Sequence, residues 1–307
     1  MDFKKKIILL AGPTASGKSR LAIKLANHFD GEIINADSMQ VYKEISILTS
    51  KPTLEDIKMA KHHLYGFISV KKKFSTGHWL ELTLQEIKKI WENKKTPIVV
   101  GGSGLYFKAL TDGLVKIPNI PKNLRQEIRE LHKNLGQKEF FNKLTKIDNL
   151  AKKFILPSDA QRCMRAYEVK KFTNESLFEL IKKTKSNFSK STFKKIFIDT
   201  PKDLLHQNIE KRIEMMFQEG VIEEVKKFLK NKIYSELSAN KIIGIREIKQ
   251  HLQGKIEINK TKELIDQKTR QYAKRQFTWA RGHMKSWEMI YSSNINDLLK
   301  KAVNKIS

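Results

Sequence analysis

One stretch of the sequence combines glycines, a lysine and a hydroxyl residue at the spacing of a phosphate-binding loop. Residues Gly12–Ser19 match the pattern GxxxxGK[ST]. In such loops glycines let backbone N–H groups close around phosphate oxygens, the lysine adds a positive charge, and the hydroxyl binds Mg²⁺. The pattern therefore predicts a phosphorylated ligand. It leaves open whether that ligand is ATP and whether a phosphoryl group is transferred.

The flanking residues predict the strand and the helix that such a loop requires. The apolar run Ile7–Ala11 indicates a buried strand before the loop. After the loop, apolar residues recur on one helical face: Leu21, Ala22, Leu25, Ala26 and Phe29. This context favours a functional site over the alternative, a glycine-rich turn that matches the pattern by accident.

Two further polar side chains follow predicted strands. Asp37 comes after the strand 32–36, and Ser103 after the glycines that end the strand 97–100. The carboxyl ends of parallel strands line the ligand crevice of an α/β sheet, so we expect both residues near the phosphate loop. Asp37 suits a Mg²⁺ ligand or a general base, but an Asp that caps the next helix fits equally well. The glycines before Ser103 permit close approach to a phosphate or simply turn the chain into a helix.

The composition sets limits on the class of protein. A chain of 307 residues that is 40% hydrophobic can form one large or two modest domains. No apolar run reaches the roughly 18 residues of a membrane span, and the apolar run after the basic N-terminus is too short for a signal peptide. Cys163 is the only cysteine, which excludes an internal disulfide and fits a reducing cytoplasm. The net charge of +27 suggests a polyanionic partner, although a genome of biased base composition also produces such a lysine excess.

The middle of the chain differs from its ends. After Pro118 and Pro121, helical patterns predominate from about Lys122 to Ser191 and no strand is evident, over a length well above that of a usual connection. We predict an α/β fold with a P-loop NTPase-like parallel sheet core, residues 1–117 and 192–307, and an inserted all-helical domain, residues 118–191. Such an insert suits a clamp on a macromolecular substrate, a lid or a purely structural excursion.

A basic and aromatic segment lies near the C-terminus. Residues 269–281 set Tyr272, Phe277 and Trp279 among four cations. Aromatic and basic residues in alternation suit a nucleic acid, because bases stack on the rings and phosphates pair with the cations. The same aromatics can equally form core beneath a solvated basic face. Arg212, in an earlier predicted helix, lies beside an apolar stripe and is not wholly buried in it.

Taken together, the motifs resemble those of the bacterial tRNA dimethylallyltransferase family. The resemblance covers the chain from Lys6 to about Trp287. It rests on five motifs in a fixed order: Gly12–Ser19, Asp37–Tyr42, Val100–Tyr106, Asp159–Arg162 and Arg270–Trp279. Each motif alone is weak, but the ordered set is highly specific.

The resemblance implies a substrate that the loop alone does not identify. The phosphorylated ligand is then dimethylallyl diphosphate, and its prenyl group goes to the exocyclic amine of the adenosine 3′-adjacent to the anticodon, in tRNAs that read codons beginning with U. Diphosphate leaves with the help of Mg²⁺, and a cation clamp stabilises the departing charge. By resemblance, the diphosphate-binding residues are Gly12, Thr14, Ala15, Ser16, Gly17, Lys18, Ser19 and Arg212, and Ser19 is also the metal ligand.

The resemblance also implies catalytic residues. Asp37 matches the family's catalytic carboxylate, which takes a proton from the amine as that nitrogen attacks the allylic carbon. Ser103 stands where the family usually has Thr, and it keeps the hydroxyl. Arg125 matches a further family position that faces the substrate tRNA.

Three stretches match tRNA contacts of the family. Their residues are Asp37, Ser38, Met39 and Gln40; Gln161, Arg162, Cys163, Met164 and Arg165; and Lys241, Ile242, Ile243, Gly244, Ile245 and Arg246. The target adenine must leave its stack to reach the base, and the insert is expected to grip the anticodon stem through its phosphates. Lys241 stands where some family members have Arg. A lysine ammonium cannot form the bidentate contact that a guanidinium forms, which weakens the case for such a tRNA contact in this protein.

These implications define one expected function and two rivals. We expect a cytoplasmic, monomeric enzyme with tRNA and dimethylallyl diphosphate as partners and no membrane association. A P-loop kinase of small molecules or nucleosides is the chief rival, because the loop and Asp37 suit it equally. A non-catalytic RNA-binding protein is the second.

Overall fold

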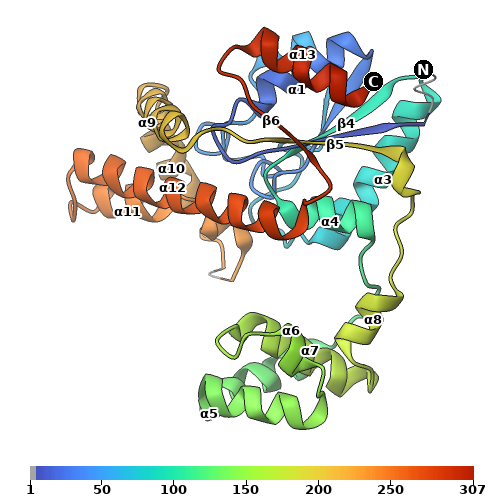
Figure 1. The fold of residues 1–307 in the computed structure, drawn as a ribbon. Helices are drawn as coiled ribbons and strands as arrows, with labels where there is room; N and C mark the ends of the chain where they lie inside the picture. The colour runs from blue at the N-terminus through green and yellow to red at the C-terminus, as the bar shows by residue number, and fades with distance from the viewer. Residues whose placement is uncertain (1–4, 235) are drawn as a thin grey trace. The chain divides into compact units, whose positions relative to one another are not determined.

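The structure of the chain, a computed structural model, describes residues 5–234 and 236–307. Within these residues lies a six-stranded sheet in the order β3-β2-β4-β1-β5-β6. The strands are β1 (Ile7–Ala11), β2 (Gly31–Asn35), β3 (His62–His63), β4 (Thr96–Gly101), β5 (Phe193–Ile198) and β6 (Glu288–Ile290). All pairings between them are parallel (Figure 1). The predicted parallel α/β core is therefore confirmed.

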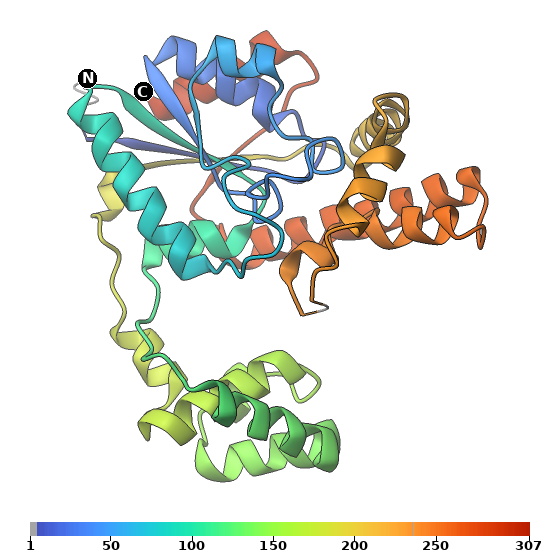
Figure 2. The same cartoon turned by 180° about the vertical axis from the view of Figure 1, so that it is seen from behind.

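Helices cover both faces of this sheet. α1 (Lys18–His28) and α13 (Ile295–Ile306) lie on one face, and α3 (Thr76–Glu92) and α4 (Gly104–Asp112) lie on the other (Figures 1 and 2). Strands β1 and β4 bury every residue. Their nearly continuous apolar sequences are typical of parallel strands that are shielded from water on both faces.

The strand order brings the predicted site residues to one edge of the sheet. β4 lies between β1 and β2, with Leu10 and Asn35 both in register with Val100. Because all three strands are parallel, their carboxyl ends meet at the same edge. The phosphate loop follows β1, the Asp37 loop follows β2, and the Ser103 loop follows β4.

A cluster of helices packs beside that edge. It consists of α9 (Lys202–Gln218), α10 (Val221–Leu229), α11 (Ile245–Leu252) and α12 (Ile258–His283). Together with the loop after β2, these helices share one apolar core that includes Tyr42, Leu48, Ile213 and Ile248. The loop itself is held by Glu224 of α10, whose carboxylate accepts hydrogen bonds from three consecutive backbone N–H groups, those of residues 46–48.

Residues Asp112–Asn187 form a separate compact unit. Its helices are α5 (Lys122–Ile147), α6 (Ala151–Phe154), α7 (Ala160–Thr173) and α8 (Leu177–Lys183). They bury a core of their own that includes Phe140, Leu144, Cys163 and Tyr167. The unit therefore contains the helices that the sequence patterns predict for this region.

Two details differ from the sequence patterns. The edge strand β3, which follows the short helix α2 (Leu54–Met59), has no counterpart in the predicted elements. The C-terminal strand β6 has no counterpart in the predicted elements. No helix in the described part of the chain is both long and apolar enough to cross a membrane.

Candidate active site

The phosphate loop is tightly wound between β1 and α1. Gly17, directly before α1, has a φ of 83°, a left-handed conformation that glycine adopts readily. A Cβ atom on Gly12 would come within 2.7 Å of the Ser16 hydroxyl oxygen. The two fixed glycines of the motif therefore have separate steric reasons: one turns the chain into the helix, and the other lets the loop close.

Two polar groups of this loop suit an anionic ligand. The Lys18 ammonium lies folded back against the loop and donates to the Pro13 carbonyl oxygen at 3.0 Å. The pKa of Lys18 is lowered to about 8, mainly by burial; Asp37 opposes this shift and neighbouring Arg212 adds to it. The Ser16 hydroxyl is buried and has no hydrogen-bond partner among the described residues. A bound phosphate would supply both a counter-charge and an acceptor.

Side chains from α9 and α12 hold the loop in place. Arg212 donates from Nη1 to the Thr14 hydroxyl at 2.9 Å, and Asn208 donates to the Ala15 carbonyl oxygen at 3.1 Å. Gln276 accepts from the Thr14 backbone N–H at 2.9 Å and donates to the Gly102 carbonyl at 3.0 Å. Burial lowers the pKa of Arg212. The loop is thus fixed by side chains of helices that lie 193 to 262 residues later in the chain.

Asp37 begins a turn and does not cap a helix. Its Oδ1 accepts a hydrogen bond from the Met39 backbone N–H at 2.9 Å, and its own N–H donates to the Asn35 side chain at 2.8 Å. The next helix, α2, begins only at Leu54. The helix-cap alternative is therefore wrong, because the side chain of Asp37 stabilises a local turn of the kind that Asp favours.

Ser103 joins the β4 loop to the Asp37 loop. The Ser103 hydroxyl accepts from the Ser38 backbone N–H at 3.0 Å and donates to the Ser38 hydroxyl at 3.3 Å. Gly101 makes this approach possible, since a Cβ atom there would lie 2.0 Å from the Ala36 carbonyl oxygen. Ser103 is therefore adjacent to the candidate base, as the sequence predicts from its place at a strand end.

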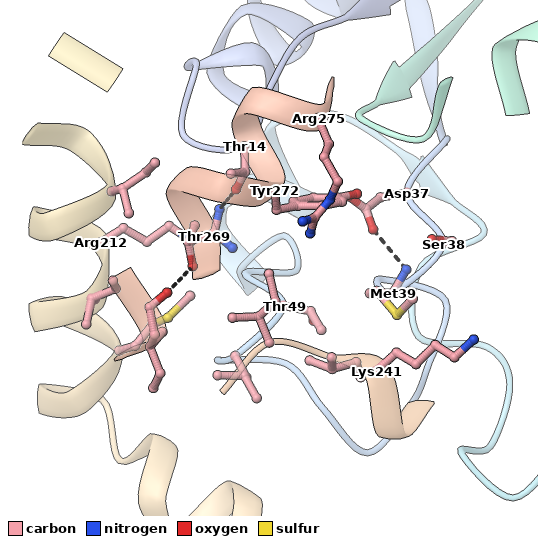
Figure 3. A pocket seen from close by; sticks show the side chains of 17 residues that line it. Thr14, Asp37, Ser38, Met39, Thr49, Arg212, Lys241, Thr269, Tyr272 and Arg275 are labelled. Carbon is pink, nitrogen blue, oxygen red and sulfur yellow. Dashed lines mark hydrogen bonds between the residues drawn. The ribbon is translucent and has the colours of Figure 1, made fainter. Parts of the chain in front are cut away.

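The phosphate loop and the Asp37 loop border one cavity of about 310 Å³ (Figure 3). Its polar wall includes Thr14, Asp37, Arg212, Tyr272 and Arg275. Its apolar wall includes Ile209, Ile213, Met216 and Ile265, from α9 and α12. The cavity thus combines a cationic end, a carboxylate and a hydrocarbon surface, which suits a ligand with a phosphorylated head and an apolar tail.

Helix α12 contributes site residues that the sequence patterns did not single out as such. Tyr272 lines the cavity, and the Arg275 guanidinium lies 5.8 Å from the centre of its ring. Burial, reinforced by Asp37, raises the pKa of the Tyr272 hydroxyl. The neighbouring aromatics have structural roles: Phe277 packs edge-on against Phe197, and Trp279 lies against Gly104. The core interpretation of this segment therefore applies to Phe277 and Trp279, whereas Tyr272 faces the cavity.

The stretch 241–246 is divided between the cavity and the core. Lys241, Ile242 and Ile243 line the cavity, and the Arg246 side chain is exposed. Ile245 is buried in the core that α9–α12 share. Gly244 has a φ of 104°, which brings its backbone against Leu48. Gln40, from the loop after β2, uses its amide to hold the carbonyls of residues 49 and 50, so this side chain shapes the loop.

In the helical unit, the predicted RNA contacts lie on α7. Asp159 caps this helix by accepting from the Arg162 backbone N–H at 3.0 Å, and the Gln161 and Arg162 side chains are exposed. Arg165 pairs with Glu168 at 3.0 Å, and Met164 is half-buried.

Two of the predicted residues in this unit are less accessible. Cys163 is fully buried in the unit's core, which rules out an RNA contact through its side chain. Its place on the α7 face that also carries Ala166 and Tyr167 explains the burial. Arg125, on α5, is half-buried, and its Nε is buried without a hydrogen-bond partner within the described chain.

The fold and the site define a P-loop α/β protein whose phosphate loop opens into a cavity for a phosphorylated, partly apolar ligand. A model of one family, the IPP transferases, matches residues 40–283. The tRNA dimethylallyltransferase of Pelagibacter ubique is 52% identical over 301 residues, which cover 98% of this chain and 96% of that protein. The chain belongs to the IPP transferase family.

Solved structures agree with this assignment. The full-length tRNA isopentenylpyrophosphate transferase of Bacillus halodurans matches with a TM-score of 0.70 at 28% identity, over 98% of each chain. A eukaryotic dimethylallyltransferase acting on tRNA matches with a TM-score of 0.83 at 27% identity, over 98% of this chain and 77% of that one.

Proposed function

We propose that the protein transfers the dimethylallyl group of dimethylallyl diphosphate to the exocyclic amine of the adenosine 3′-adjacent to the anticodon, and releases diphosphate. The single observation that carries this proposal is the cavity in which a P-loop, the Asp37 carboxylate and an apolar wall come together. The names of the related proteins, tRNA dimethylallyltransferases, support the same chemistry. By family resemblance, the substrates are tRNAs that read codons beginning with U.

The cationic end of the cavity accounts for the leaving group. As the allylic C–O bond breaks, negative charge grows on the diphosphate, so groups aimed at it stabilise the transition state more than the ground state. The candidates for this role are Lys18, Arg212, the loop N–H groups and the Ser16 hydroxyl, which has no hydrogen-bond partner among the described residues. The apolar side chains of α9, among them Ile209 and Ile213, then face the five-carbon group.

Asp37 accounts for the proton. The exocyclic amine of adenine is a poor nucleophile, and removal of its proton during attack assists formation of the N–C bond. Asp37 Oδ1 is occupied by the Met39 N–H, whereas Oδ2 has no hydrogen-bond partner in the part of the chain that the structure describes. We assign the proton to Oδ2. An adenine that reaches this carboxylate must be flipped out of its stack.

We propose Mg²⁺ as the metal ion, with the Ser19 hydroxyl as its protein ligand. Among the described residues no cluster of three or more His, Cys, Asp or Glu side chains could hold a metal. An ion at Ser19 would therefore take most of its ligands from the diphosphate and from water, which is the usual manner of Mg²⁺ at phosphate sites. The ion would neutralise charge on the leaving diphosphate.

The partner is tRNA, through the anticodon stem-loop. Exposed cations support this, notably Lys241 and Arg246 near the cavity and Arg162 on α7. We propose that the unit of residues 112–187 grips the stem through its phosphates, as the helical insert of the predicted architecture. We further propose that the enzyme acts as a monomer in the cytoplasm.

The test is a comparison of two transfers by the purified protein. One reaction contains radiolabelled dimethylallyl diphosphate and tRNA with adenosine at the target position. The other contains ATP labelled on its γ-phosphate with nucleosides or tRNA as acceptors. The proposal expects label in tRNA only in the first reaction. Label transferred only from ATP would establish a kinase, and tRNA binding without either transfer would establish a non-catalytic RNA-binding protein.

A further inference from the structure

The buried side-chain amide of Asn35 is hydrogen-bonded to the backbone of Asp37, the candidate base. Asn35 is the last residue of β2 and is fully buried, although the other buried positions of this strand's end are mostly apolar. Burial of an amide is unfavourable unless its hydrogen-bonding groups find partners. The strand therefore holds a polar side chain at a position where an apolar one is the usual choice.

Two of the three partners of this amide belong to the backbone of Asp37. The Asn35 Oδ1 accepts from the Asp37 N–H at 2.8 Å, and its Nδ2 donates to the Asp37 carbonyl oxygen at 3.0 Å. The same Nδ2 donates to the Leu64 carbonyl oxygen at 3.0 Å. The orientation of the amide is fixed by its partners, because a flipped amide would place two donors face to face at the Asp37 N–H.

The third partner connects Asp37 to the edge of the sheet. Leu64 follows β3 and has a φ of 62°, an uncommon conformation for a residue with a side chain. The strand before it is anchored by His63, whose ring nitrogens lie 2.6 Å from Glu32 and 3.0 Å from Glu86. Because these contacts anchor the end of β3, the position of the Leu64 carbonyl is well fixed. Its hydrogen bond therefore also fixes the position of the Asn35 amide.

We infer that Asn35 is a positioning residue for Asp37: its carboxamide holds the backbone of Asp37 so that Oδ1 stays on the Met39 N–H and Oδ2 stays free as the base. This inference rests on the proposed function. Asn35 itself faces away from substrate, since it is fully buried and does not line the cavity. Its effect on the reaction therefore passes through Asp37.

The expected effect is on turnover. Without the amide, the Asp37 N–H and carbonyl lose their partner, and the carboxylate can shift relative to the amine. Misplacement of a catalytic group by about 1 Å can cost about 10²-fold in rate. Asn35→Ala should therefore lower kcat by about tenfold to about 10²-fold, while the Kd values for dimethylallyl diphosphate and tRNA stay within about threefold of the wild type.

The experiment is a double-mutant cycle on the full chain with both substrates saturating. Asn35→Ala is measured alone and combined with Asp37→Ala, and Asn35→Asp is a second variant that keeps the volume but replaces the donor. The control is Thr96→Val, which removes a hydrogen bond from the buried Thr96 hydroxyl to the Phe29 carbonyl at the other end of the sheet. All variants are checked by thermal unfolding.

The cycle separates positioning from general destabilisation. If Asn35 acts through Asp37, the double variant is no slower than Asp37→Ala alone, and Thr96→Val keeps the wild-type kcat. A wild-type kcat in a folded Asn35 variant, or losses that multiply in the double variant, would overturn the inference. Failure of the wild-type protein to prenylate tRNA would instead refute the proposed function, so the two failures are distinguishable.

Discussion

Raising the pH from 7 to 9 should weaken the binding of dimethylallyl diphosphate, because Lys18 then loses its proton. Burial lowers the pKa of this ammonium to about 8 in the free protein. The group is therefore about nine-tenths charged at pH 7 and about one-tenth charged at pH 9. Bound diphosphate keeps the lysine protonated through its negative charge. The protein must then take up a proton on binding at high pH, which costs affinity.

The magnitude follows from this titration. If the complex requires the charged form, Kd should rise about tenfold between pH 7 and pH 9, equivalent to about 1.4 kcal/mol. Isothermal titration calorimetry without tRNA measures this, and at pH 8.5 it should also detect proton uptake in buffers of different ionisation enthalpy. Lys18→Arg is the matched control, because arginine stays charged throughout this range.

The comparison with the control removes other sources of pH dependence. Titration of the ligand affects both proteins equally, so only the difference between the two curves reports on Lys18. The reasoning expects a slope for the wild type that the Arg variant lacks. Parallel curves, or no proton uptake by the wild type, would show that Lys18 does not titrate near pH 8 or does not contact the diphosphate.

Three further predictions concern the base, the helical unit and the sheet. Asp37→Ala should lower turnover about 10²- to 10⁴-fold with little change in tRNA affinity, measured by single-turnover transfer and filter binding; lost binding with normal turnover of bound tRNA would make Asp37 an RNA-positioning group instead. Arg162→Ala should weaken tRNA binding and lower its log–log salt slope by about 1, leaving the affinity for dimethylallyl diphosphate unchanged; an unchanged slope speaks against a phosphate contact. Gly101→Ala should destabilise the fold by about 3 kcal/mol in urea unfolding, because its Cβ atom would lie 2.0 Å from the Ala36 carbonyl oxygen. Gly282→Ala, a helix position with open space around it, is the control and should be neutral or slightly stabilising.

The parts of the fold that the sequence predicts well are those with local causes. The strand, loop and helix around Lys18 follow from an apolar run, a glycine pattern and a helical period, all within about thirty residues. Strand β3 has no such pattern: His62 and His63 join the sheet because β2 offers its edge and because Glu32 and Glu86 pair with His63. Long-range pairing of this kind leaves little trace in the local sequence.

The residues of the site also divide into those that local sequence patterns predict and those that depend on long-range packing. Asp37 and Ser103 are predictable because parallel strands end at a common edge. The role of Tyr272 is not, since periodicity cannot tell a ring that lines a cavity from one that packs in the core, like Phe277. The positioning role of Asn35 is likewise not predictable from the sequence, because its partner Leu64 lies 29 residues away in the chain.

The central claim is that one cavity holds a departing diphosphate beside a carboxylate that deprotonates the flipped adenine. The most direct test is to incubate the protein with dimethylallyl diphosphate and tRNA, and to measure released diphosphate together with the position of the modified nucleoside by mass spectrometry. The account predicts one diphosphate for each dimethylallyl group, found on the exocyclic amine of the adenosine 3′-adjacent to the anticodon, and a rate that collapses in Asp37→Ala. Modification elsewhere in the tRNA, or an undiminished rate in that variant, would contradict it.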